Sequence, residues 1–151
     1  MLVNTYYAKA IVIQGYSEAI IGELSLLLDR IIEIIQKLKI EDDFNSGRIH
    51  FLTINVGRNS LTYNTFVKQL KSRIGKTIYL EDAIKLYNDN EELAKDVIEF
   101  YNNLFSEIHT LDLNEKLTNI VKKEEKIIKK SIKNFNTLNS ILKSYLSKES
   151  V

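Results

Sequence analysis

Proline is absent from this sequence, and glycine occurs only 5 times in 151 residues. Turns depend on both residue types, whereas the interior of a helix excludes proline and disfavours glycine. A chain with so few turn residues suits a few long helices better than many short strands. Its length is enough for one domain with its own apolar core. We therefore expect residues 1–151 to form a single, mainly α-helical domain.

A wide apolar stripe runs through residues 4–39. Its main row recurs at spacings of four and three, as expected for one helix face: Ile20, Leu24, Leu27, Ile31, Ile34 and Leu38. A second row widens the stripe: Ile21, Leu28, Ile32 and Ile35. A face this broad is typical of a helix in the middle of a bundle. The segment is expected to be one long helix or two nearly continuous ones.

Residues 6–14 admit an alternative. Gly15 interrupts the pattern, and Ser17 can cap a new helix after it. Ile11, Val12 and Ile13 are three β-branched residues in a row, which favour an extended backbone. We expect helix here, with a strand as the alternative.

Residues 48–57 show the alternation that is typical of a strand. His50, Leu52 and Ile54 fall on one side of an extended chain, and Gly47 and Gly57 bound the segment. A lone strand needs a partner, so the sequence predicts a short β-hairpin or an irregular crossover near residues 48–57. A short buried helix is the competing interpretation.

Four more helical segments complete the expected bundle: residues 60–74, 80–87, 89–108 and 113–146. Two capping-box patterns mark helix starts, Asp89 with Glu92 and Asp112 with Glu115. The last helix is strongly amphipathic, and one charged residue, Glu124, falls within its apolar stripe. We therefore predict a bundle of about four or five helices, framed by long N- and C-terminal helices that pack near antiparallel.

Motifs for catalysis, metal binding or cofactor binding are not evident. The chain has no cysteine, and its two histidines, His50 and His109, lack the spacing of a metal site. Gly75, Lys76 and Thr77 resemble the end of a phosphate-binding loop, but Leu70 stands where that loop requires glycine. We expect a non-enzymatic protein with no catalytic residues, no cofactor, no metal and no small-molecule substrate.

The most apolar window, residues 19–35, contains Glu23, Asp29, Arg30 and Glu33, which are costly inside a bilayer. Residues 1–16 lack the positive start and the small-residue cleavage site of a signal peptide. The expectation is therefore a cytoplasmic protein with no membrane span.

The formal net charge of +1 conceals a strong separation of charge along the chain. Residues 44–80 carry six basic and no acidic residues, whereas residues 81–115 carry two basic and ten acidic residues. Residues 1–43 carry −3, and residues 116–151 carry +6. These blocks, rather than the total charge, bear on the choice of partner.

Two sets of cations are the candidate contact residues for nucleic acid or an acidic partner. The first set is Arg48, Arg58, Lys68, Lys71, Arg73 and Lys76, and the second is Lys122, Lys126, Lys129, Lys130 and Lys133. Such residues can neutralise phosphates, and nearby aromatic rings can stack on bases. In the alternative, Tyr63 and Phe66 belong to the core, segment 44–80 pairs with the acidic segment 81–115, and the lysines of the last helix form an ordinary solvated face.

These patterns favour a non-catalytic interaction or assembly protein, acting as a small subunit of a larger complex or particle. Helical subunits of nucleoprotein complexes and of viral particles share this profile, as an analogy of class only. We expect a protein partner or self-association. The alternative is a nucleic-acid-binding protein that contacts the phosphate backbone through segment 44–80 and the lysine face of the last helix.

Overall fold

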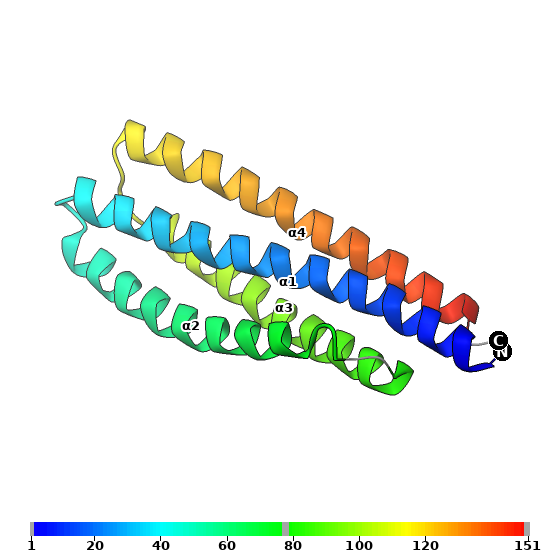
Figure 1. The fold of residues 1–151 in the computed structure, drawn as a ribbon. Helices are drawn as coiled ribbons and strands as arrows, with labels where there is room; N and C mark the ends of the chain where they lie inside the picture. The colour runs from blue at the N-terminus through cyan, green and yellow to red at the C-terminus, as the bar shows by residue number, and fades with distance from the viewer. Residues whose placement is uncertain (1, 77–78, 150–151) are drawn as a thin grey trace.

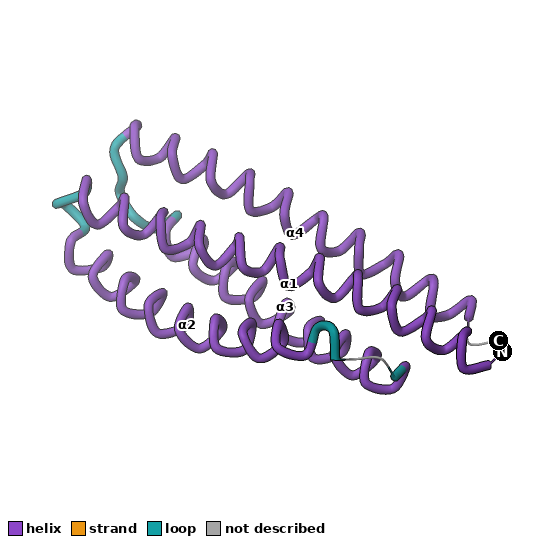
Figure 2. Tube along the Cα trace, viewed as in Figure 1, coloured by secondary structure: helices purple, strands orange, loops and turns teal. Residues whose placement is uncertain are grey.

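The computed structural model describes residues 2–76 and 79–149, and within them it contains four helices and no strand. The helices are α1 (Leu2–Glu41), α2 (Ser46–Arg73), α3 (Leu80–Ile108) and α4 (Glu115–Glu149). They form one elongated bundle (Figures 1 and 2). The prediction of a mainly α-helical bundle is confirmed, with a helix count at the lower end of the expected range.

The helices alternate in direction along the bundle, because each is joined to the next by a short connection. α1 therefore begins, and α4 ends, at the same end of the molecule (Figure 1). The α1–α2 connection and the start of α4 lie at the opposite end. The first half of α2 consequently lies beside the second half of α1.

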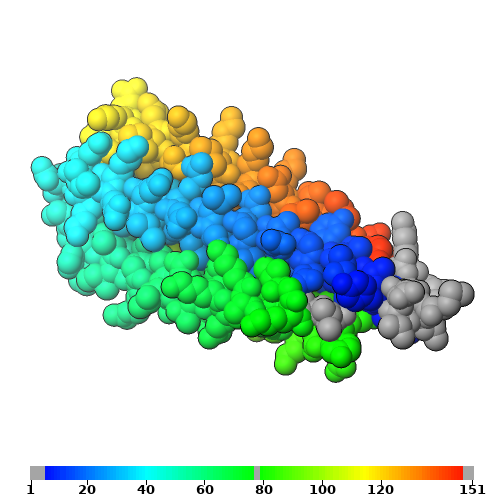
Figure 3. All heavy atoms as spheres, viewed as in Figure 1, coloured from blue at the N-terminus to red at the C-terminus, as the bar shows by residue number. Residues whose placement is uncertain are grey.

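α1 is the centre of the bundle. It packs against each of the other three helices, whereas α2 and α4 make no contact with each other within the described residues. In Figure 3, α1 crosses the middle of one face, with α4 on one side and α2 on the other. The wide apolar stripe explains this position, because both of its rows are covered by neighbouring helices. Its fully buried members include Ile20, Ile21, Leu24, Leu28, Ile31 and Ile35.

The predicted hairpin or crossover near residues 48–57 is wrong, because the segment lies inside α2. Ile49, Leu52 and Val56 are buried there at spacings of three and four. The interpretation of residues 6–14 as helix is confirmed, and α1 continues through Gly15 without a break. A glycine inside a helix costs about 1 kcal/mol, which the buried apolar residues on both sides of Gly15 offset.

Both predicted capping boxes are misplaced. Asp89 lies inside α3, which runs unbroken from Leu80 and so joins the two segments expected at 80–87 and 89–108. α4 begins at Glu115, and the side-chain oxygen of Asn114 accepts a hydrogen bond of 2.9 Å from the backbone N–H of Leu117. Asn114, rather than Asp112, is therefore the residue that caps α4.

Gly75 ends α2, as expected for a helix stop. Its φ of 85° lies in the left-handed region that favours glycine, and it follows Ile74, where the helical backbone has already ended. Thr77, the last residue of the phosphate-loop resemblance, lies outside the described residues.

A buried polar contact joins α1 to α3. Asn90 is fully buried, and its side-chain amide donates a hydrogen bond of 2.8 Å to the backbone carbonyl of Ser17, which is also fully buried. The buried amide nitrogen of Asn90 is satisfied by this hydrogen bond, whereas its side-chain oxygen has no partner among the described residues. The contact favours one register of α3 on α1, because a shift would leave the amide nitrogen without a partner as well.

Polar contacts also join α4 to its neighbours. Arg30 of α1 donates a hydrogen bond of 2.9 Å to Glu124, which explains how a carboxylate is tolerated in the apolar stripe of α4. α3 and α4 approach each other less closely than the other contacting pairs. Between them, His109 lies 2.7 Å from Glu125, and Lys143 lies 3.1 Å from Glu91. Burial alone would raise the pKa of Glu91, but hydrogen bonds from Lys143 and Lys95 hold that pKa below its usual value.

Candidate interaction surfaces

The eleven predicted contact residues lie in two separate places. Those of the first set lie on α2 or directly after it, and those of the second set lie on α4. α2 and α4 flank α1 on opposite sides, and in the described part of the chain they do not touch (Figure 1). The fold therefore does not bring the two sets together into one patch.

Two members of the α2 set are engaged within the molecule. Arg48 donates hydrogen bonds to the backbone carbonyl of Thr110, at 3.2 Å, and to its hydroxyl. Arg73 forms an ion pair of 2.7 Å with Asp89 of α3. The other four are exposed and have no ion pair among the residues that the structure describes: Arg58, Lys68, Lys71 and Lys76. Pairing between the basic and acidic segments thus involves one direct ion pair in the described chain.

The α4 set forms a solvated lysine face. Lys129 pairs with Glu125 of the same helix at 3.1 Å. The other four members are exposed, and within the described residues they have no ion pair: Lys122, Lys126, Lys130 and Lys133. The opposite side of α4 carries the buried residues Leu117, Val121, Ile128, Phe135 and Leu142.

An exposed apolar ridge on α2 was not identified from the sequence. Phe51, Ile54 and Leu61 are 74%, 45% and 73% exposed. At about 100° per residue they point away from the buried side of α2, with Arg58 between them. We name these four residues the α2 ridge. They are spaced three, four and three residues apart, as in the seam of a coiled coil. This helical spacing is missed when the segment is interpreted as a strand.

The charge around the ridge has one sign. α2 contains no aspartate or glutamate. Its exposed charged residues are Arg48, Arg58, Lys68 and Lys71. The α2 ridge is therefore an apolar surface in a basic surrounding.

A second exposed face lies on α1. From Tyr7 to Glu33, the exposed residues of α1 are Tyr7, Ala8, Ile11, Val12, Gly15, Glu18, Ala19, Gly22, Leu26, Asp29 and Glu33. Eight of these are apolar or small, and the three charged ones are all acidic. We name this set the α1 outer face. It is therefore an apolar surface with acidic charge, and its apolar part lies in the first two thirds of α1.

The segment Tyr6–Glu41 of α1 is long and apolar enough, by length and composition, to cross a membrane. The core helix of a soluble bundle meets the same criterion. In this bundle, one side of α1 is covered by the other three helices. The side that remains open includes the α1 outer face and, beyond Glu33, the exposed residues Gln36, Lys37 and Ile40.

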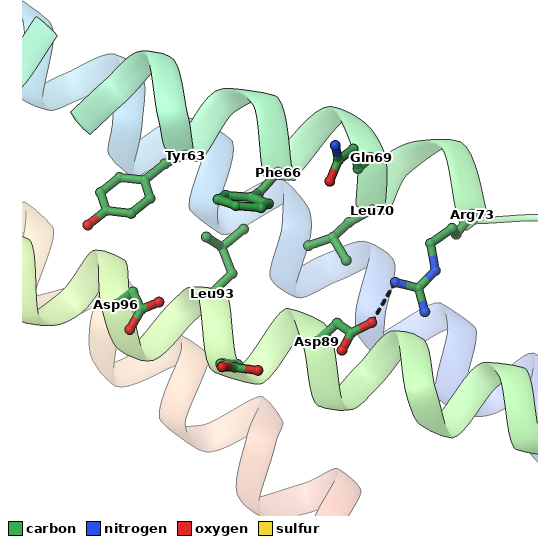
Figure 4. Close-up of a pocket in the computed structure, with 9 residues that line it drawn as sticks. Tyr63, Phe66, Gln69, Leu70, Arg73, Asp89, Leu93 and Asp96 are labelled. Carbon is green, nitrogen blue, oxygen red and sulfur yellow. Dashed lines mark hydrogen bonds and ion pairs between the residues drawn. The ribbon is translucent and has the colours of Figure 1, made fainter. Parts of the chain in front are cut away.

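A groove of about 340 Å³ lies between α2 and α3 (Figure 4). Phe66 and Leu70 of α2 face Leu93 of α3 across it, and the Arg73–Asp89 ion pair closes one end. Glu92 and Asp96 also line the groove. A groove with apolar walls and carboxylates suits a cationic or apolar group, and its charge disfavours phosphate.

Tyr63 lines the same groove, and its ring packs edge-to-face on Phe100 at a centroid distance of 5.8 Å. Burial raises the pKa of Tyr63, and the nearby carboxylates of Asp96 and Glu99 raise it further. Tyr63 is thus part of the packing between α2 and α3. In the described part of the chain, no three His, Asp or Glu side chains are grouped so that they could hold a metal ion.

Most of the acids of α3 face solvent. Glu81, Asp82, Glu92, Asp96, Glu99 and Glu107 are exposed. Within α3, which is described in full, no large apolar side chain is among the exposed ones. The outer face of α3 is therefore acidic and polar, unlike the α1 outer face.

Comparison with protein-family models, with curated proteins and with solved structures finds no match for this chain.

Proposed function

We propose that this protein is a non-catalytic assembly protein, a small helical subunit of a larger complex or particle. The observation that carries the proposal is the exposure of large apolar side chains on the outer faces of α1 and α2, of which Phe51, Leu61 and Leu26 are 74%, 73% and 59% exposed. Contiguous exposed apolar surface is typical of sites that bind another protein. The same two helices carry opposite charge around these surfaces, which favours a specific orientation of the partner.

The measurement that tests the proposal is the mass of the purified protein in solution, by sedimentation or light scattering, over a wide range of concentrations. We expect the mean mass to rise with concentration, or a second protein to copurify in a fixed ratio. A strictly monomeric protein with no copurifying partner would contradict the proposal.

Nucleic-acid binding is the second candidate function. It is supported by the four exposed cations Arg58, Lys68, Lys71 and Lys76, which have no ion pair among the described residues, and by the exposed ring of Phe51. Two observations weaken it: the α2 and α4 cations lie on opposite sides of α1, and the groove between α2 and α3 is lined by the carboxylates of Asp89, Glu92 and Asp96.

Titration of a labelled DNA duplex at several salt concentrations tests this second function. If the four free cations of the α2 set each neutralise one phosphate, the log–log slope of affinity against salt is expected to be roughly −4. The double variant Lys68→Gln/Lys71→Gln should then reduce the slope to roughly half, because two phosphate contacts are lost. A flat response, or no binding at low salt, would exclude binding of this kind.

A further inference from the structure

The α1 outer face and the α2 ridge are complementary to each other. Both are exposed and apolar, but the charged residues on the first are Glu18, Asp29 and Glu33, whereas the exposed charged residues of α2, which carries the second, are all basic. They belong to different helices of one molecule and point away from its core, so they cannot meet within one chain. They can meet between two copies.

We propose that the α2 ridge of one copy docks on the α1 outer face of a second copy. The inference rests on the proposed function and names the surface and the partner that this function would use. Leu61 and Phe51 supply the apolar contact, and Arg58 lies between the apolar residues of the ridge, where it meets the acidic charge of the facing helix.

The shape of the α1 outer face suits a helix as its partner. Gly15, Ala19 and Gly22 leave the middle of this face with little side-chain volume, and a Cβ added at either glycine would meet no atom within 4 Å. Ile11 and Leu26 are exposed on either side of this stretch. Small residues allow two helix backbones to approach closely, while larger apolar residues at the ends add contact area.

The charges argue against two simpler pairings. Two α2 ridges facing each other would bring Arg58, Lys68 and Lys71 of both copies together, and two α1 outer faces would do the same with carboxylates. The acidic face of α3 cannot replace the α1 outer face, because within α3, which is fully described, no large apolar side chain is exposed. Of these pairings, the one between the α2 ridge and the α1 outer face both buries apolar surface on each copy and brings opposite charges together.

This contact joins unlike faces, so an open assembly has one free α2 ridge at one end and one free α1 outer face at the other. Such an interface produces a ring if its rotation closes and an open filament if it does not. Because the ridge lies near the α1–α2 connection and the apolar part of the α1 outer face lies toward the other end, neighbouring copies are displaced along the bundle axis.

Two double variants and their mixture test the contact. Phe51→Gln/Leu61→Gln removes the two most exposed apolar side chains of the α2 ridge, and Ile11→Gln/Leu26→Gln removes two large apolar side chains of the α1 outer face. Glutamine preserves helix propensity in both variants. We expect each variant alone to associate at least about a hundredfold more weakly than the wild type, because two large apolar side chains are lost from the contact.

The mixture is the decisive sample. Each variant retains the face that the other lacks, so an equimolar mixture should sediment as a pair with one copy of each and form nothing larger. Ile141→Gln, which changes an exposed apolar residue of α4, is the matched control and should assemble like the wild type. Circular dichroism confirms that all the variants remain helical.

Other results overturn the contact and separate it from the proposed function. A mixture that stays monomeric, or variants that assemble like the wild type, exclude this pairing while leaving an assembly role in place. A wild type that is monomeric but copurifies with another protein also excludes this pairing between copies and leaves the assembly role in place.

Flotation of the wild type with phosphatidylcholine vesicles, lost in Ile11→Gln/Leu26→Gln, would assign the α1 outer face to lipid. A monomer with no partner overturns both proposals.

Discussion

Replacement of Leu28 by alanine is expected to lower the free energy of unfolding by about 3 kcal/mol. Leu28 is 0% exposed and lies in the part of α1 that the other helices cover. The substitution removes buried apolar atoms and leaves a cavity, because helices that are packed against one another relax only in part. Urea unfolding followed by circular dichroism measures the loss.

Leu26 provides the matched control, since it is the same residue type, two positions earlier in the same helix. It is 59% exposed, so Leu26→Ala should change the free energy of unfolding by less than about 0.5 kcal/mol. Both measurements should be made at protein concentrations below any self-association. Equal losses for the two variants would contradict the orientation of α1 in the bundle.

The substitution Asn90→Asp is expected to lower the free energy of unfolding by at least about 3 kcal/mol at pH 7. The amide of Asn90 donates a hydrogen bond to the carbonyl of Ser17 and is fully buried. An aspartate in its place would put a carboxylate beside that carbonyl oxygen, without a donor. Desolvation would then raise the pKa of the new carboxyl group above its value in the unfolded chain.

The pH dependence of this loss has a definite sign. Below the pKa of aspartate in the unfolded chain, about 3.9, both states are protonated and the electrostatic penalty is absent. As pH rises above that value, the unfolded state releases its proton first, so the variant loses stability relative to the wild type until the folded-state pKa is passed. Comparing the two proteins by urea unfolding between pH 4 and pH 7 measures this trend.

Asn88→Asp is the control for this experiment. Asn88 lies on the same helix and is exposed, so the same change of side chain there should cost less than about 0.5 kcal/mol at every pH. A loss at Asn90 that does not depend on pH would contradict the burial of an ionised carboxylate at this position and would assign the loss to the missing amide donor.

The sequence was most informative where a pattern was long. The stripe of α1 extends over many turns, and its width alone indicated a helix that needs neighbours on more than one side. The segment at residues 48–57 is too short for this. Leu52 and Val56 fit both a strand face and a helix face, and the burial that decides between them depends on packing against another helix, which the segment's own pattern does not reveal.

Short sequence motifs gave wrong predictions where the packing of buried residues determined the structure instead. The Asp89–Glu92 pattern has the residues of a helix start, but Leu86 and Tyr87 before it and Leu93 after it are all buried, so the helix continues through it. The partners of Arg48 and Arg73 could not be predicted either. They lie 62 and 16 residues away in the chain, and only the packing of α2 on α3 brings them within reach.

The central position of α1 has a consequence for how the molecule opens. α4 makes no contact with α2 in the described chain, and it touches α3 less than it touches α1. It can therefore separate while α1, α2 and α3 keep most of their shared core. Native-state hydrogen exchange would register such an opening as a unit of low stability, with the amides of α4 exchanging before those of α1, which are released only when the whole bundle unfolds.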